Sequence, residues 1–180
     1  MVDVLGHFAA GLLWAIPAWF VWERRRVLIF LGFVLSAAMV PDIDLYVPWL
    51  AHHGPTHTIL FVVAAGIVGG AVTTLVAMWW SGWAGRSEGF RPMLYAFSTG
   101  ALLAGGLSHV FMDLLSNSQA GQPLNPFWPF FEKPFHLYVI HHFSAPIWNG
   151  FLLLGALTIH LVLFTLKPAL SFRGLSARDG

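Results

Sequence analysis

The sequence contains no cysteine and few charged residues. Without cysteine, disulfides, thiolate metal sites and a cysteine nucleophile are excluded, so any metal must be bound by His, Asp or Glu. Charged residues make up 9% of the 180 residues, whereas soluble proteins average about 25%. The net charge of +1 provides no broad basic surface, and we therefore expect no nucleic-acid partner. These absences argue against an ordinary soluble protein.

Apolar residues are abundant instead. They make up 57% of the chain, and the mean hydropathy is +0.71. Five apolar segments, each near the roughly 20 residues that cross a bilayer as a helix, cover about 5–22, 27–45, 57–80, 92–116 and 146–166. We predict an all-α polytopic membrane bundle with about five transmembrane helices, forming a single integral membrane domain over residues 1–180 in a lipid bilayer. Because Asp3 precedes the first segment and no basic stretch does, we expect a retained helix rather than a cleaved signal peptide.

The positive charges predict an orientation. Eight of the nine Lys and Arg residues follow segments one, three or five, namely Arg24, Arg25, Arg26, Arg86, Arg91, Lys167, Arg173 and Arg178. Five crossings place these three regions on one side, and cytoplasmic loops are enriched in Lys and Arg. We therefore expect a multi-pass protein of the cell membrane, with the N-terminus outside and the C-terminus in the cytoplasm.

Histidines and aspartates gather at the opposite ends of the same segments. The residues are His7 at the start of the first segment, Asp42 and Asp44 at the end of the second, His57 at the start of the third, and His109 and Asp113 at the end of the fourth. All these ends are predicted to be extracytoplasmic. Ionisable residues at membrane helices are costly and usually functional, so we expect them to form one site.

The residue types in this set indicate a metal site. His109 and Asp113 are four residues apart, so on a helix both side chains project from one face and can bind one ion or two adjacent ions. Imidazole combined with carboxylate suits zinc first, with manganese as an alternative. In "PDID", Asp42 and Asp44 are expected to alternate along an extended or turn segment, so one carboxylate could bind the metal while the other orients a ligand or acts as a base. Gly11, one turn after His7, would let another helix approach closely.

The stretch "HHGPTHT" contributes a turn beside the site. Gly54 and Pro55 indicate a turn, after which Thr56 is a candidate N-cap for a helix beginning at His57. His52 and His53 are either interfacial loop residues or catalytic groups that hold a phosphate or transfer a proton.

The loop 117–145 follows the fourth segment. Its aromatic stretch, residues 125–138, is typical of an interfacial belt and could also form a lid that admits a lipid chain. Lys133, His141 and His142 are candidate substrate-binding residues, with plain interfacial anchoring as the alternative. His160 lies deep in the last segment and is not assigned to the site.

Four motifs in order, "GHFAAG", "PDID", "HHGPTHT" and "SHVFMD", resemble those of the YdjM-type family of membrane-bound, metal-dependent hydrolases. They cover residues 6–113. The chain departs from the family pattern at His53, where the family usually has an Arg. The order of these residues also resembles the metal framework of zinc-dependent phospholipase C and related single-strand nucleases.

That resemblance implies a ligand set. It aligns five residues as metal ligands: His7, Asp44, His57, His109 and Asp113. Asp113 would bridge two ions, and the absence of a later HxxxE motif favours a two-metal site over a three-metal one. The implied activity is hydrolysis.

We therefore expect one or two divalent ions, zinc first, and cleavage of a phosphoester, with a lipid headgroup favoured over an aqueous substrate. Asp42 or His52 would accept the proton, and His53 or Lys133 would steady the phosphate. The alternative is a metal-binding or metal-transporting membrane protein without hydrolytic activity, including one in which the metal only joins helices. A metalloprotease is disfavoured because the sequence contains no HExxH motif.

Overall fold

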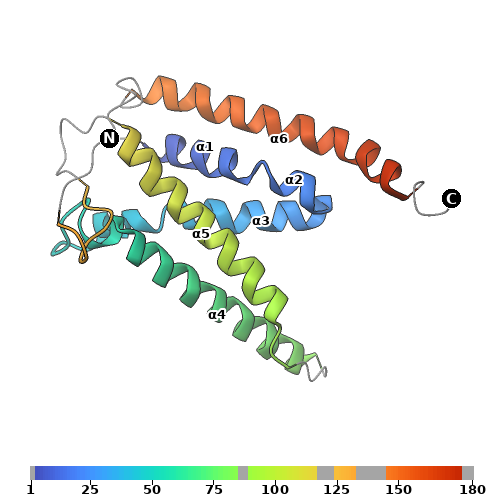
Figure 1. Ribbon diagram of the computed structural model, residues 1–180, viewed down its shortest axis with the longest axis horizontal. Helices are drawn as coiled ribbons and strands as arrows, with labels where there is room; N and C mark the ends of the chain where they lie inside the picture. Colours follow the sequence, from blue (N-terminus) through green and yellow to red (C-terminus); the bar gives the residue numbers. More distant parts are fainter. Residues whose placement is uncertain (1–2, 85–88, 117–123, 133–144, 176–180) are drawn as a thin grey trace.

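The computed structural model describes residues 3–84, 89–116, 124–132 and 145–175. Its long elements within these ranges are all helices, which confirms the predicted helical bundle (Figure 1). They are α1 (Val4–Ala15), α2 (Ala18–Val21), α3 (Arg24–Ala37), α4 (Ile59–Trp83), α5 (Pro92–Leu115) and α6 (Pro146–Leu175), with short 3₁₀ helices η1 (Pro41–Tyr46) and η2 (Pro55–His57).

Four described segments are long and apolar enough to cross a membrane: Val4–Val21, Ile59–Trp83, Pro92–Leu115 and Pro146–Lys167. The helical segment α3 lies where the remaining crossing was expected, but it has 14 residues. At about 1.5 Å per residue it is roughly 21 Å long, shorter than the roughly 30 Å hydrocarbon layer. It ends at Ala37, and Pro41 then begins η1. Pro41 has no N–H to donate to the Ala37 carbonyl, so the α-helical hydrogen-bond pattern cannot continue there.

A proline also divides the first span into α1 and α2. Pro17 lacks an N–H, and the N–H of Ile16 bonds to the Leu13 carbonyl, 3.3 Å away, in a tightened last turn. The Leu12 carbonyl instead accepts a hydrogen bond from His160 Nε2 of α6, at 2.8 Å. His160 thus satisfies a helix carbonyl inside the membrane, where no water could do so.

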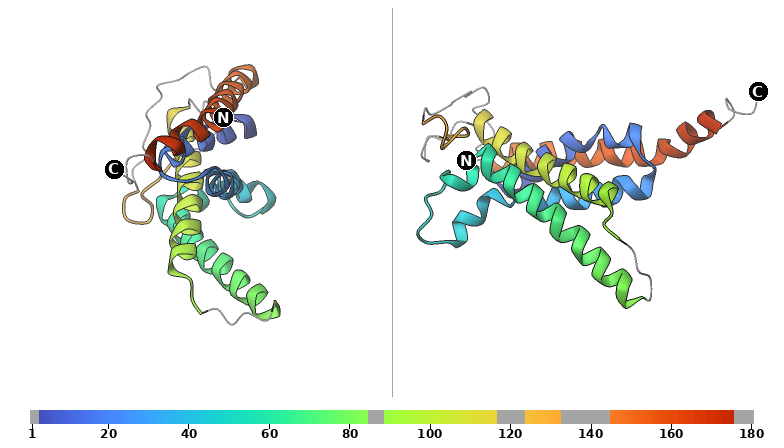
Figure 2. Two further views of the ribbon diagram at one scale, coloured as in Figure 1. Left: turned by 90° about the vertical axis from the view of Figure 1, so that its right-hand side faces the viewer. Right: turned by 60° about the horizontal axis from the view of Figure 1, so that its bottom comes forward.

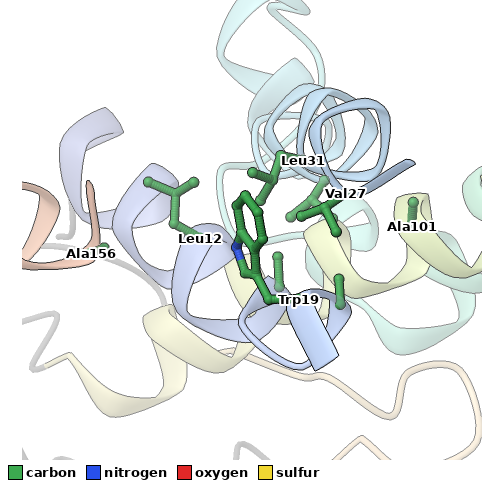
Figure 3. Close-up of a cluster of buried hydrophobic side chains, with 9 residues drawn as sticks. Leu12, Trp19, Val27, Leu31, Ala101 and Ala156 are labelled. Carbon is green, nitrogen blue, oxygen red and sulfur yellow. The ribbon is translucent and has the colours of Figure 1, made fainter. Parts of the chain in front are cut away.

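Trp19 is the centre of the main apolar cluster. Its indole ring lies between Leu12, Val27 and Leu31, so it joins α1, α2 and α3 (Figure 3). The side chain is 2% exposed, and its Nε1–H donates to His160 Nδ1 at 2.6 Å. Both ring nitrogens of His160 are therefore engaged in joining α6 to the other helices, which is a structural role.

Glycines allow α3 to lie very close to its neighbours. A Cβ atom at Gly105 of α5 would be 2.2 Å from the Val34 carbonyl oxygen of α3. At Gly11 of α1 it would be 3.2 Å from the Val34 side chain, in agreement with the predicted close approach there. The three helices α1, α3 and α5 thus pack together, α6 covers α1, and α4 pairs with α5 (Figures 1 and 2).

The contact at Gly105 generates a prediction on stability. Gly105→Ala should lower the free energy of unfolding in detergent by about 1–3 kcal/mol, because the added methyl group overlaps backbone. The matched control is Gly100→Ala in the same helix, where an added Cβ meets nothing within 4 Å. That change should be neutral or stabilising, because alanine favours helix over glycine. Thermal unfolding followed by circular dichroism measures both, and equal midpoints for the two variants would contradict the tight α3–α5 contact.

Candidate metal centre

Six side chains from four elements meet at the end of the bundle where α1 begins and α5 ends (Figure 1). We call them the His/Asp cluster: His7 of α1, Asp42 and Asp44 of η1, His57 of η2, and His109 and Asp113 of α5. All six are buried. The described basic residues Arg24, Arg25, Arg26, Arg91 and Lys167 lie toward the opposite ends of α3, α5 and α6.

His109 is oriented by the end of α3. Its Nδ1–H donates to the carbonyl oxygen of Ala38 at 2.6 Å. This hydrogen bond places the proton on Nδ1 and leaves the Nε2 lone pair directed into the cluster, as in metal-binding histidines, which commonly donate their other ring N–H to a carbonyl or carboxylate.

His57 is held in the same way by polar groups around it. Its Nδ1 lies 3.2 Å from Asp44 Oδ2 and 3.1 Å from Thr56 Oγ1. Thr56 also donates to Asp44 Oδ2 at 2.8 Å. The prediction that Thr56 caps the following helix is wrong: the cap is Thr58, whose hydroxyl accepts from the Phe61 N–H, and His57 lies in η2 before the helix begins.

Two histidine nitrogens lie close together beside two carboxylates. His57 Nε2 and His109 Nε2 are 3.2 Å apart, and each lies between 3.1 and 3.7 Å from Asp42 Oδ1 and from Asp113 Oδ2. Ligand atoms about 2.0–2.1 Å from a tetrahedral zinc ion would lie about 3.3 Å from each other. The donor set and its spacing therefore fit a transition-metal ion.

Asp113 also reaches a second histidine. Its Oδ1 lies 3.6 Å from His7 Nε2, while Oδ2 is 3.1 Å from His109 Nε2. The two imidazole rings are stacked, with centroids 3.7 Å apart and an interplanar angle of 11°. Asp113 thus has one oxygen beside each ring, which is the arrangement that a carboxylate bridging two ions requires.

The electrostatics of the cluster favour a bound cation. Both carboxylate oxygens of Asp113 are buried and receive no hydrogen bond from the described residues. Two buried carboxylates among imidazole lone pairs are costly without a positive charge between them.

Asp42 and Asp44 occupy different positions in this arrangement. Asp42 faces the two Nε2 atoms, whereas Asp44 lies behind His57 and also bonds to His52 Nδ1 at 3.1 Å. The geometry therefore favours Asp42 as the ligand of the central group and Asp44 as a residue that orients histidines. The resemblance had implied Asp44 as the ligand. Asp42, Asp44 and His52 also come close enough to form a further metal-sized group.

His52 and His53 lie at the rim of the cluster. The side chain of His52 is 25% exposed, whereas His53 is buried. The ring centroid of His53 is 5.0 Å from that of His57. His53 adopts φ of 64°, an uncommon conformation for a residue with a side chain, and this turn directs both rings toward His57.

The predicted substrate-binding residues Lys133, His141 and His142 lie outside the described residues.

Two groups that orient the histidines of the cluster were not predicted from the sequence. Thr56 carries a weak signal, since it stands between two site residues, but the Ala38 carbonyl carries none because it is a backbone group on another helix.

These features define the class of protein: a multi-helix membrane protein with a buried His/Asp cluster able to hold a metal ion. The chain belongs to the YdjM inner membrane protein family, whose family model matches residues 1–176, which confirms the resemblance seen in its motifs. Searches against curated proteins and against solved structures found no match. The description of the family gives a membrane location and names no reaction.

The cluster predicts metal content. Purified protein should retain one or two transition-metal ions per chain after a mild chelator wash, and His109→Ala and Asp113→Ala should each lose them, because each removes a donor from the central group. Elemental analysis by plasma mass spectrometry measures this.

The matched control for these variants is His160→Ala, which removes another buried histidine but one bound to Trp19 and Leu12. It should keep its metal. Wild-type protein that holds no ion even after incubation with zinc or manganese would contradict a metal centre.

Proposed function

We propose that this protein is a metal-dependent hydrolase of phosphoesters, with a lipid headgroup as the favoured substrate. The observation that carries the proposal is the close grouping of two histidine lone pairs with two carboxylates beside a partly exposed histidine. A zinc or manganese ion bound there would supply an activated water near neutral pH and stabilise negative charge on phosphoryl oxygens.

The chain's own groups would perform the remaining tasks. His57 and His109 present their Nε2 atoms because their Nδ1 atoms are held by Asp44 and Ala38. Asp42 and Asp113 supply the negative charge that balances the cation. Because these groups are held by packing from four elements, they need no rearrangement when a substrate arrives.

His52 is the best placed proton acceptor. Asp44 Oδ1 lies 3.1 Å from its Nδ1, which favours a proton on Nδ1 and a basic Nε2. Its partial exposure puts it between the buried cluster and the interface, where a water or a leaving group could exchange a proton with it. His53, beside it, would contact the phosphate.

The position in the membrane supports a lipid substrate and an extracytoplasmic site. The cluster lies at helix ends, where headgroups lie, and the described arginines at the other ends favour the cytoplasm for that side. A lipid could then approach laterally without leaving the bilayer.

A second candidate function is supported by the burial of the cluster. Structural metal sites are closed, whereas catalytic ones keep an open position, and His7, His57 and His109 are almost fully buried. A metal held there without turnover would join α1, η1, η2 and α5 as a structural link, and this role requires no substrate.

Turnover distinguishes the two candidates. Zinc- or manganese-loaded protein should hydrolyse bis(p-nitrophenyl) phosphate in detergent or phosphatidylglycerol in liposomes, and chelation should abolish the activity. His52→Gln should keep its metal but lose about 10²–10⁴-fold in kcat, because a positioned proton acceptor contributes about that factor.

The control for this experiment is Tyr46→Phe, which alters an exposed side chain of η1 away from the donor atoms. It should behave as the wild type. Protein with full metal content and no activity on either ester would favour the structural role, and full activity of His52→Gln would exclude His52 as the proton acceptor.

A further inference from the structure

An apolar groove lies at the same end of the bundle as the His/Asp cluster. It runs between the first turns of α4 and the described aromatic segment 124–132, with a volume of about 260 Å³. The side chains that line it include Ile59, Leu60, Val63, Phe127, Phe130 and Phe131. Its walls come from two parts of the chain that lie at the same end of the bundle in Figures 1 and 2.

The groove is joined to the cluster through the backbone. Ile59, at its upper end, is two residues after His57, and the Ile59 N–H donates to the Pro126 carbonyl at 2.8 Å. Ile59 and Val63 lie one turn apart on the same face of α4, so the groove leads from the cluster along the helix toward the bilayer core. The neighbouring face of α4 is occupied by packing against α5, where Val62 contacts Gly106.

The chemistry of the groove differs sharply from that of the neighbouring His/Asp cluster. The cluster has carboxylates and imidazoles suited to a cation and hence to an anionic group, whereas the groove is lined by apolar and aromatic side chains. A ligand that matches both is amphipathic, with a phosphate group joined to a hydrocarbon chain. The volume is below the roughly 300–1,000 Å³ of sites that enclose a whole small molecule, so the groove fits part of a single chain.

We propose that this groove binds one acyl chain of a phospholipid whose headgroup phosphate lies at the metal centre. The inference rests on the proposed function for the headgroup and adds the site that selects a lipid. The larger cavity of about 680 Å³, lined in part by Trp22, Phe30 and Phe97, lies at the opposite end of α5 from the cluster, so it does not lead to the metal centre.

The test uses a phosphatidylglycerol that carries a photoreactive diazirine in the headgroup-proximal part of one acyl chain, in proteoliposomes of the full protein. After illumination, mass spectrometry should recover the label mainly from residues 59–63 and 124–131. Leu60→Trp should reduce this labelling roughly ten-fold, because filling the groove removes the contacts of the bound chain.

The matched control is Leu75→Trp, which places the same bulk on α4 outside the groove. Leu75 is 60% exposed and Leu60 is 45% exposed. Leu75→Trp should keep the wild-type labelling pattern, and metal content shows that both variants are folded. Label spread evenly over the apolar surface, or equal labelling of the groove in both variants, would overturn the proposal.

Asp113→Asn separates this inference from the proposed function, because it removes a metal donor and leaves the groove intact. Groove labelling that persists in this variant supports the acyl site whether or not the wild type shows turnover. Hydrolysis of bis(p-nitrophenyl) phosphate by a protein whose groove is not labelled would retain the hydrolase and reject the acyl site.

Discussion

The hydrogen bond from His109 to the Ala38 carbonyl joins the helix bundle to the His/Asp cluster. An α-helix leaves its last four carbonyls without an intrahelical donor, and Ala38 lies at the end of α3. Had α3 continued toward residue 45, the N–H of residue 42 would have taken this carbonyl. The early end of α3 therefore provides the acceptor that sets the tautomer of His109, and η1 then turns Asp42 toward the same point.

Two glycines make that hydrogen bond possible. Gly105 is one turn before His109 on α5, and Gly11 is one turn after His7 on α1, so each lies on the same helix face as a histidine of the cluster. Both contact α3 near Val34. The absence of side chains at these positions brings the backbones of the three helices together, and this spacing lets imidazoles from α1 and α5 stack at 3.7 Å. The packing that stabilises the bundle and the geometry of the centre are thus one arrangement.

Because the His/Asp cluster is buried, the loss of one of its charged groups changes the energy of all the others. Charged groups in apolar surroundings are costly unless they are paired or bind a cation, and partial removal leaves an uncompensated charge. The His/Asp cluster concentrates that cost at helix ends close to the interface. Another buried histidine, His160, lies away from the cluster, and its two nitrogens are satisfied by Trp19 and the Leu12 carbonyl. The two buried histidine environments serve different purposes although the residue type is the same.

Residues close in sequence were predicted better than relations between elements. Spacing placed His109 and Asp113 on one helix face, and the apolar segments located the helix starts to within about three residues. The ends were predicted less well: α3 ends at Ala37 rather than near residue 45, and α6 continues to Leu175. The same reasoning misplaced the cap of α4, because a 3₁₀ turn at His57 precedes the helix and leaves Thr58 as the cap. It also assumed an extended or turn conformation for "PDID", whereas a 3₁₀ helix with about three residues per turn sends Asp42 and Asp44 in different directions.

The amino-acid sequence by itself determined the helical membrane class, the family, the donor types available to a metal and their placement at one end of the helices. These follow from composition, hydrophobic length and spacing within single elements, which are local properties. Only the tertiary structure decided that Asp42 faces the histidine lone pairs, that Asp44 and Ala38 orient the rings, and that Asp113 lies between His7 and His109. Those relations depend on how closely α1, α3 and α5 approach each other, and a distance between helices is set by packing rather than by sequence separation.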